Sequence, residues 1–395
     1  MKAASAEGKD PMSILLVGIS VRAAAESAVR SGYEVQALDV FGDTDLSAAC
    51  PTLSLMRDFP QLYPDVASQT VRLFLCSTLL DFEEVAYGSG FENHPECVRE
   101  WEAMGKTILG NESDVLVSIR NWRKLFDFLD SKGIDHPETH IVNDLSKFDL
   151  SSLDPDQFIV KPALSGGGHG IRPLAEVAGL PNLPEEWAGR TVLVQRRLEG
   201  LLTSASFVSG DEGFRLLSTT LQLVGNAFSP FRYVGNIAPL DAPPGIRRRM
   251  EEIARSIATE FDLKGSNGVD FMLVGRQVNV LEVNPRIQGS LEVVERASGV
   301  GVFDAHVRAC RGQGLPSIAR TPGFWGRRIV YAPADLLTGE LGGLGFVKDV
   351  PSPNMPLRAG APVCTVLAHS RSSSRCGSLL KQREKRVISL LHQPA

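Results

Sequence analysis

The stretch GVDFMLVGRQVNVLEVNPRIQGS, residues 268–290, contains two apolar runs joined by a short turn and predicts a β-hairpin. Within it, Glu282 and Asn284 are two residues apart, so their side chains project from the same face of a strand. A three-residue turn centred on Arg276 would place Asp270 of the preceding strand opposite Glu282, whereas a two-residue turn would shift the register by one. In either register two carboxylates and an amide oxygen converge.

These three side chains offer only hard oxygen ligands, which favour Mg²⁺ or Mn²⁺ over zinc. Arg286 follows two residues after Asn284, and its permanent positive charge can clamp a transferring phosphoryl group. A surface hairpin with solvated charges is the alternative. The apolar residues between the polar ones disfavour it, because they indicate carboxylates on a buried sheet, where a carboxylate needs a cation. We therefore predict Asp270, Glu282 and Asn284 as metal ligands and Arg286 as a catalytic residue.

Further upstream, QFIVKPALSGGGHGI, residues 157–171, predicts a strand that delivers Lys161 at its end and continues into a glycine-rich loop. A lysine is a compact donor to phosphate oxygens, and successive glycines let backbone N–H groups approach an anion closely. Taken alone, such a loop is more often a flexible turn, and the Walker sequence is absent. Between these blocks, TVLVQRRLEG, residues 191–200, is either a strand leaving the core with a charged end or the lining of a nucleotide pocket.

Near the start of the chain, SILLVG (13–18), a small-residue helix over 21–31 and YEVQALDV (33–40) predict a β-α-β unit. Its turn holds one glycine, so it lacks the dinucleotide fingerprint and disfavours a nicotinamide dehydrogenase. Ser20 and Arg22 stand where a helix N-terminus stabilises an anion. A capping serine and a solvated arginine explain these two residues equally well.

A polar loop, residues 87–93, presents Glu92 and Asn93 as substrate-site candidates, with a structural turn as the alternative. From Asn121 the apolar spacing predicts a helix that Gly133 ends. Near the C-terminus, RSSSRCGS is expected to form a mobile loop, and the basic amphipathic stretch SLLKQREKRVISLL to form a docked helix.

Length and composition set wider bounds. A chain of 395 residues exceeds what one hydrophobic core supports, so two or three domains are expected. A formal net charge of -5 disfavours a nucleic-acid-binding surface. The six cysteines show no zinc-ligand spacing, and neither a secretory signal nor a run of 18 apolar residues is present. We therefore predict a cytoplasmic protein with reduced cysteines and no membrane partner.

In the order and approximate spacing of these three blocks, the sequence resembles the ATP-grasp superfamily over roughly residues 121–304. Because of SGGGHG and EVNPRIQGS, it is most similar to the predicted ATP-dependent carboligases related to biotin carboxylase. The resemblance implies a mixture of α/β and α+β structure with the ATP-grasp architecture. The implied parts are a flexible tail (1–12), a Rossmann-like pre-ATP-grasp domain (13–115), an ATP-grasp domain (116–320, with subdomains 116–195 and 196–320) and a β-rich C-terminal extension with a terminal helix (321–395).

The same resemblance implies roles for individual residues. Lys161 would contact the α and β phosphates of ATP, the glycine loop would cover the β and γ phosphates, and residues 195–198 would form the adenine hinge. Asp270, Glu282 and Asn284 would hold one or two Mg²⁺ ions, with Glu282 bridging. The expected nucleotide ligands are Lys124, Lys161, Ser165, Gly166, Gly167, Gly168, His169, Gly170, Gln195, Arg196, Arg197, Leu198 and Glu199. The expected substrate ligands are Ser20, Arg22, Glu92, Asn93 and Gln288.

Two positions depart from the family pattern. Trp122 stands where the family usually has an earlier phosphate-binding lysine, which leaves Arg123 and Lys124 as candidates for that contact. Leu202 replaces the acidic residue commonly used for the ribose hydroxyls, so Glu199 is the candidate for this role.

The implied function is that of an ATP-dependent carboxylate-amine ligase, in which a carboxylate becomes an acyl phosphate and an amine then displaces phosphate. Its rival is a biotin-carboxylase-like carboligase that activates bicarbonate, and a third reading is a nucleotide-binding module without turnover. Relatives of this branch suggest cofactor biosynthesis of the one-carbon-carrier type. The expected partners are ATP with Mg²⁺ or Mn²⁺, a small carboxylate and an amine, and a second copy of the chain in a homodimer.

Overall fold

The protein is described by a computed structural model over residues 14–62, 69–178, 187 and 189–391. The predicted tail, residues 1–12, lies outside the described residues. No helix in the described part of the chain combines the length and the apolarity needed to cross a membrane.

The first sheet is parallel and has five strands in the order β3-β2-β1-β4-β5. Its central strand β1 is fully buried, as its apolar sequence ILLV requires. The predicted β-α-β opening is confirmed, with α1 ending one residue earlier than expected. The strands are β1 (Ile14–Val17), β2 (Val35–Asp39), β3 (Thr52–Ser54), β4 (Glu84–Tyr87) and β5 (Thr107–Leu109). The helices are α1 (Arg22–Arg30), α2 (Thr44–Ala49), α3 (Leu55–Asp58), α4 (Gln69–Ser77), α5 (Pro95–Ala103) and α6 (Ser113–Ile119), with short 3₁₀ turns η1 (Pro60–Leu62) and η3 (Phe91–Asn93).

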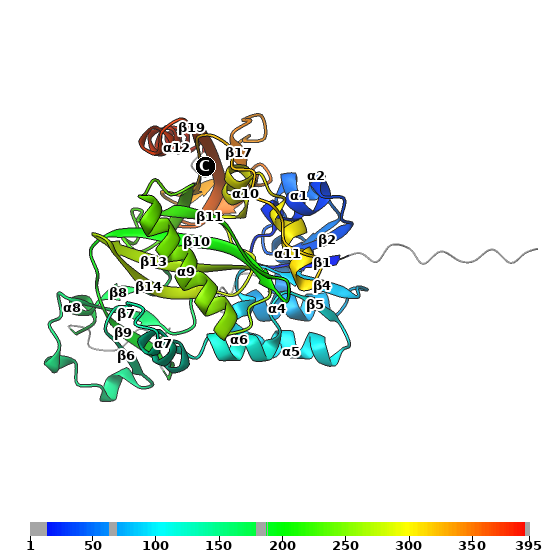
Figure 1. The fold of residues 1–395 in the computed structure, drawn as a ribbon. Helices are drawn as coiled ribbons and strands as arrows, with labels where there is room; N and C mark the ends of the chain where they lie inside the picture. Colours follow the sequence, from blue (N-terminus) through cyan, green and yellow to red (C-terminus); the bar gives the residue numbers. More distant parts are fainter. Residues whose placement is uncertain (1–13, 63–68, 179–186, 188, 392–395) are drawn as a thin grey trace, which may run out of the picture.

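The second sheet is small and antiparallel, with the order β6-β9-β7-β8, and it lies apart from the first in Figure 1. Helix α7 precedes it, and Asn121 caps this helix by accepting a hydrogen bond from the Lys124 amide. The elements are α7 (Trp122–Ser131), β6 (Thr139–Val142), η4 (Leu145–Lys147), η5 (Leu150–Ser152), β7 (Phe158–Pro162), β8 (Arg172–Pro173), α8 (Leu174–Ala178) and β9 (Val192–Arg196).

The third sheet is antiparallel and runs β14-β13-β10-β11-β12-β15-β19-β17, so the C-terminal strands extend the sheet that carries the 268–290 hairpin. The elements are β10 (Leu201–Gly210), β11 (Gly213–Val224), β12 (Tyr233–Ala238), α9 (Pro244–Glu260), β13 (Gly265–Val274), β14 (Gln277–Asn284), α10 (Leu291–Ser298), α11 (Val302–Cys310), β15 (Phe324–Tyr331), β16 (Leu336–Leu337), β17 (Val347–Lys348), β18 (Pro356–Leu357), β19 (Pro362–Ser370) and α12 (Ser373–Ile388).

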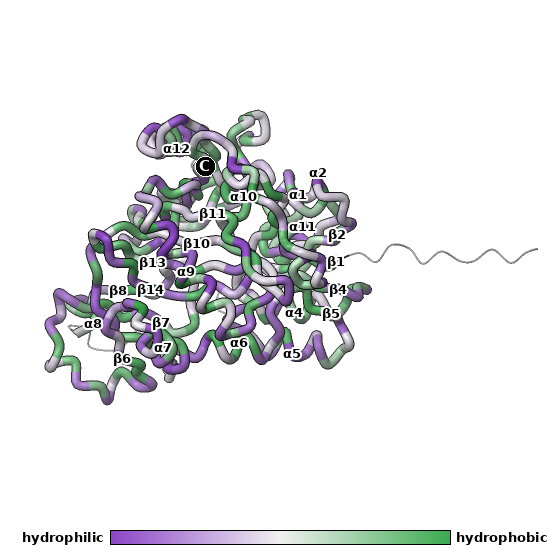
Figure 2. The backbone as a smooth tube through the Cα atoms, in the orientation of Figure 1, coloured by the Kyte–Doolittle hydropathy of each residue, from purple (hydrophilic) through white to green (hydrophobic). Residues whose placement is uncertain are grey.

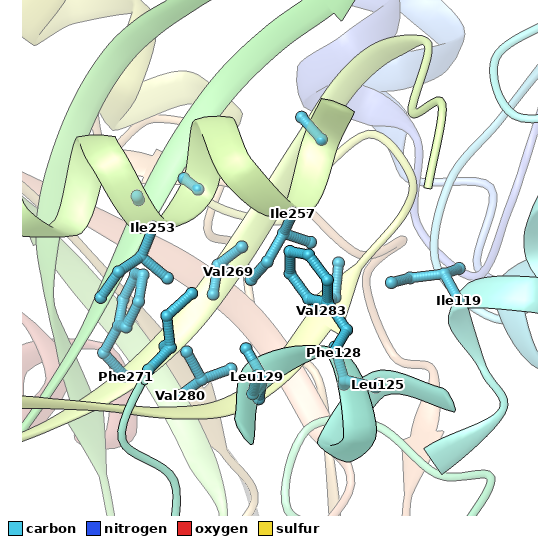
Figure 3. Close-up of a cluster of buried hydrophobic side chains, with 14 of the residues drawn as sticks. Ile119, Leu125, Phe128, Leu129, Ile253, Ile257, Val269, Phe271, Val280 and Val283 are labelled. Carbon is cyan, nitrogen blue, oxygen red and sulfur yellow. The ribbon is translucent and has the colours of Figure 1, made fainter. Parts of the chain in front are cut away.

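A buried apolar cluster fixes which face of the hairpin is polar. Val269, Phe271 and Val283 point toward α7 and α9 and pack with residues of these helices, such as Leu129 and Ile257 (Figure 3). Because side chains alternate along a strand, the residues between the apolar ones project from the opposite face of the sheet. The core packing therefore directs the polar residues of the hairpin away from α9.

One expectation near the C-terminus is wrong. The segment RSSSRCGS was expected to be a mobile loop, but α12 begins inside it at Ser373. Ser372 caps the helix by accepting a hydrogen bond from the Arg375 amide, and Cys376 is buried against the sheet. The polar composition that suggested a loop is instead that of a capped helix start, and the predicted docked helix is present. In Figure 2 the α12 segment is mainly purple, in keeping with its many Lys and Arg residues.

Candidate active site

A β-bulge sets Asp270 opposite Glu282. The hairpin turn has two residues, because Val274 pairs with Gln277, and that spacing alone would have shifted the register. A register shift between Asp270 and Phe271 then brings Asp270 into pairing with Glu282. The three-residue turn considered from the sequence is not formed, yet the pairing that it would have produced is present.

Asp270 is held by two amide side chains. Gln222 Nε2 of β11 donates to its Oδ1 at 2.7 Å, and Asn284 Nδ2 donates to its Oδ2 at 3.0 Å. Removal from water, together with the negative charge of Glu282, raises the pKa of Asp270 to about 7. Gln222 was not anticipated from the sequence, because β11 comes to the hairpin only through the sheet.

Arg286 connects the hairpin to the first sheet. Its Nε donates to Glu92 Oε1 at 2.8 Å, and its Nη2 donates to Asn284 Oδ1 at 2.9 Å. Glu92 also accepts a hydrogen bond of 2.6 Å from the Gly90 amide. Although burial opposes ionisation, the Arg286 guanidinium lowers the pKa of Glu92, so this carboxylate is charged and fixes the orientation of Arg286.

Two buried cations face this cluster. The pKa of Lys161 is lowered by burial, and the negative charges of Glu282 and Asp270 partly oppose that shift. Arg120 is likewise lowered in pKa by burial, against the charges of Glu282 and Glu92. Lys161 Nζ and the Arg120 guanidinium lie 5.1 Å and 5.6 Å from the centre of the Trp122 ring. Lys161 and Arg120 therefore both lie within the influence of Glu282, together with Asp270 and Glu92.

Arg120 was missed by the sequence analysis. Its Nη2 donates to Asn93 Oδ1 at 2.6 Å and to the Ala163 carbonyl at 3.3 Å. The expected ligand Lys124 is exposed, and its Nζ donates instead to Ser118 Oγ at 2.6 Å and lies 5.3 Å from the Phe261 ring centre. The structure therefore does not place Lys124 with the cluster. The sequence held one indication of this role. Arg120 lies two residues before Trp122, and Trp122 occupies the position at which the family usually has a phosphate-binding lysine.

The glycine loop contacts the turn between β11 and β12. The Tyr233 amide donates to the Gly167 carbonyl at 3.0 Å, and an Arg232 nitrogen lies 3.2 Å from His169 Nδ1. A Cβ atom on Gly168, whose φ is 74°, would lie 1.9 Å from the Phe231 carbonyl oxygen. Glycine at this position is therefore required for the loop to meet the third sheet. Ser165 Oγ donates to the Pro162 carbonyl at 3.3 Å and belongs to the same turn.

The predicted adenine hinge follows β9. Gln195 is buried and donates to Thr139 Oγ1 at 2.9 Å, while Arg196 pairs with Glu138 at 2.7 Å. The Arg197 amide donates to the Gln157 carbonyl at 2.7 Å. Leu198 is partly buried and Glu199 is exposed. The side chains of Gln195 and Arg196 therefore bond to other residues of the protein. A contact to adenine from this segment stays a prediction.

The substrate prediction for Arg22 is wrong. This side chain is fully buried and pairs with Asp349 at 2.8 Å and Glu292 at 2.9 Å, besides two further carboxylates, Glu26 and Asp45. Burial opposes its charge, yet these carboxylates raise the pKa of Arg22 further, as expected of a structural ion-pair network. Each of its three nitrogens donates to a carboxylate of the chain itself.

Ser20 and Gln288 have different surroundings. Ser20 is exposed after β1, and no contact in the described part of the chain brings it to the cluster. Gln288 accepts a hydrogen bond from Ser206 Oγ. It lies over Gly268, where an added Cβ would fall 1.1 Å from Gln288 Nε2. Since Gly268 precedes Asp270 by two residues on the same strand, Gln288 is placed near the cluster.

The hairpin fits a divalent cation. Asp270 and Glu282 face each other across the bulge, and burial together with the charge of Glu282 raises the pKa of Asp270, so a bound cation would favour its charged form. Asp270, Glu282 and Asn284 would hold Mg²⁺, since carboxylate and amide oxygens suit this ion. In the described part of the chain no three His, Cys, Asp or Glu side chains form a metal-binding group. Asn284 Oδ1 accepts from Arg286 Nη2, so the role of Asn284 as a metal ligand stays a prediction.

Comparisons with known proteins bear on the fold and the family. Residues 119–290 match the family model of an ATP-grasp domain. An uncharacterised protein of Methanocaldococcus jannaschii is 21% identical over 384 residues, which cover 93% of this chain and 91% of that relative. The formate-dependent phosphoribosylglycinamide formyltransferase of Methylococcus capsulatus is 30% identical over 179 residues, or 42% of this chain and 43% of that enzyme. The chain thus spans less than half of that relative.

Solved structures resemble the whole chain. The biotin carboxylase of Campylobacter jejuni superimposes with a TM-score of 0.72 at 13% identity, covering 96% of this chain and 92% of that one. The N5-carboxyaminoimidazole ribonucleotide synthetase of Thermus thermophilus gives a TM-score of 0.68 at 15% identity, covering 95% and 98%. These likenesses establish the fold and confirm the architecture expected from the sequence. The chain carries the ATP-grasp fold, and its residues 119–290 belong to the ATP-grasp domain family.

Proposed function

We propose that this protein is an ATP-dependent ligase that phosphorylates a small carboxylate and passes the acyl group to an amine. The observation that carries the proposal is the meeting of Arg120 and Lys161 with the carboxylates of Asp270 and Glu282 beside an oriented Arg286. Such a set can hold a triphosphate and stabilise the charge that develops during phosphoryl transfer.

In the proposed reaction a carboxylate oxygen attacks the γ-phosphorus of ATP, the bond to the bridging oxygen breaks, and ADP leaves. The amine nitrogen then attacks the acyl carbon, and inorganic phosphate leaves together with the amine proton. Mg²⁺, when bound, supplies positive charge to the phosphate oxygens. Arg120 and Lys161 bind phosphate oxygens, and Arg286 binds the transferred phosphoryl group. Glu92 keeps the Arg286 guanidinium in one orientation, so little reorganisation is needed in the transition state.

The relatives support the substrate class. By name, the formate-dependent phosphoribosylglycinamide formyltransferases use formate, a small carboxylate, and act on a glycinamide. The whole-chain likeness to biotin carboxylase favours bicarbonate activation as the second candidate function. A role in the biosynthesis of a one-carbon-carrying cofactor remains a proposal, as does a homodimer, which light scattering would test.

An ADP-release screen tests the proposal. The chain would be incubated with Mg²⁺ and ATP against amino acids, small carboxylates and bicarbonate, each with and without candidate amines. We expect ADP release that requires a carboxylate and rises with one amine, whereas dependence on bicarbonate would favour the second candidate. Binding is checked separately, because ligand at 100 times its dissociation constant stabilises a protein by about 2.7 kcal/mol. The absence of both a thermal shift and calorimetric heat with saturating Mg²⁺-ATP would contradict the assignment.

A further inference from the structure

A cavity lies away from the residues of the candidate active site. It has a volume of about 370 Å³, opens to the surface and is lined by α10, β15, β19, α12 and the segment leading into β17. The labels of α10, β17, β19 and α12 stand together at the top of Figure 1. The cavity is large enough for a small organic molecule. None of the residues proposed to bind ATP, metal or substrate lines it.

The lining of this cavity is cationic. Arg296, Lys348 and Arg383 contribute positive charge, and no Asp or Glu is among the described residues that line it. Glu292 and Glu26 pair with Arg296 and Lys348, at 3.1 Å and 2.7 Å, from positions outside the lining. Arg383 has no carboxylate partner among the described residues. Its guanidinium donates to the Leu367 carbonyl and lies 4.8 Å from the centre of the Phe346 ring. The uncompensated charge of the cavity is therefore centred on Arg383.

The walls also offer aromatic surface. Trp325 stacks on His369, with ring centres 4.0 Å apart. The indole Nε1 of Trp325 is itself buried, so the ring and not its N–H faces the cavity. Phe346 and Leu367 add apolar surface beside it. An anion with a planar body matches these features.

We propose that this cavity binds a small molecule that joins a phosphate or carboxylate group to a planar ring. The anionic group pairs with Arg383, and the ring lies against Phe346 and Trp325. Two features connect the cavity walls to the segment that carries Gln288. Helix α10 begins directly after Gln288 and Gly289, and Arg327, two residues after Trp325, donates to the Gly289 carbonyl.

The four tryptophans of the chain provide a direct test. In protein carrying ¹⁵N-labelled tryptophan, each indole N–H gives one signal, and the Trp325→Phe spectrum identifies that of Trp325. The probes are phenyl phosphate, benzoate and inorganic phosphate, added in the presence of saturating Mg²⁺-ATP so that the nucleotide site is filled. We expect phenyl phosphate or benzoate to shift the Trp325 signal saturably and inorganic phosphate to bind more weakly. Whichever ring compound binds more tightly identifies the anionic group.

Two variants with the same charge change localise the binding. Arg383→Gln should weaken the ring probe at least tenfold by calorimetry, whereas Arg386→Gln should leave its affinity within about twofold. Arg386 is exposed on the same helix and does not line the cavity. Equal losses in the two variants would overturn the proposal, and so would a Trp325 signal that does not move at about 10 mM probe, ten times a millimolar dissociation constant. Calorimetry does not depend on the folding of Trp325→Phe, so the proposal stays testable if that variant is unstable.

Discussion

The position of Arg120 yields a sharp prediction about phosphate binding. The sequence suggested Lys124 as the early cation, but the structure places Arg120 between Asn93 and Trp122, within the influence of Glu282. We expect Arg120→Gln to remove one buried charge-assisted contact to ATP, which contributes about 1.5–3 kcal/mol. This corresponds to a dissociation constant for Mg²⁺-ATP about 10- to 150-fold higher. Isothermal titration calorimetry on the full chain measures the effect.

Lys124→Gln is the matched control, since it removes one positive charge four residues further along the chain. Its side chain is exposed and bonds to Ser118, so the affinity for Mg²⁺-ATP should stay within about twofold. Arg120→Lys should give an intermediate loss, because a point charge does not reproduce a planar fork. Circular dichroism and thermal unfolding confirm that each variant is folded. If Lys124→Gln weakened binding as much as Arg120→Gln, the placement of the phosphates beside Arg120 would be refuted.

Three further predictions follow from the cluster and from one buried carboxyl. Glu282→Gln should abolish ADP release while the circular dichroism spectrum is retained, and near-normal turnover would show that the metal site is elsewhere. Arg286→Ala should lower the single-turnover rate about 10²- to 10³-fold, or about 2.7–4 kcal/mol, with little change in ATP affinity. A large loss of affinity with an unchanged chemical step would contradict that role. Burial raises the pKa of Asp39 to about 7 from an ordinary value of 3.8, so the folded state loses stability as pH rises between these values. Asp39→Asn should therefore raise the melting temperature above pH 7 but hardly at pH 4, and an equal gain at both would argue against this cause.

The ionic network around Arg22 shows why one sequence hypothesis failed. The sequence predicted this arginine at a helix N-terminus, where an anion is stabilised, and α1 does begin at Arg22. The anions turned out to be side chains from far along the chain, since Asp349 and Glu292 are 327 and 270 residues away. An arginine paired with several carboxylates of the same chain has a structural role. The residues next to it in the sequence do not distinguish it from an arginine that binds a ligand.

The sequence alone determined the polar face of the 268–290 hairpin, the position of Lys161 at a strand end and the ATP-grasp family. Alternation along a strand is local, so Glu282 and Asn284 could be assigned to one face without any knowledge of their neighbours. Only the tertiary structure decided that a bulge restores the Asp270 pairing, that Arg120 rather than Lys124 joins the cluster, and that Gln222 supports Asp270. These outcomes depend on packing between segments far apart in the chain, because sheet register and buried charge pairing are set by the whole core rather than by the residues next to them.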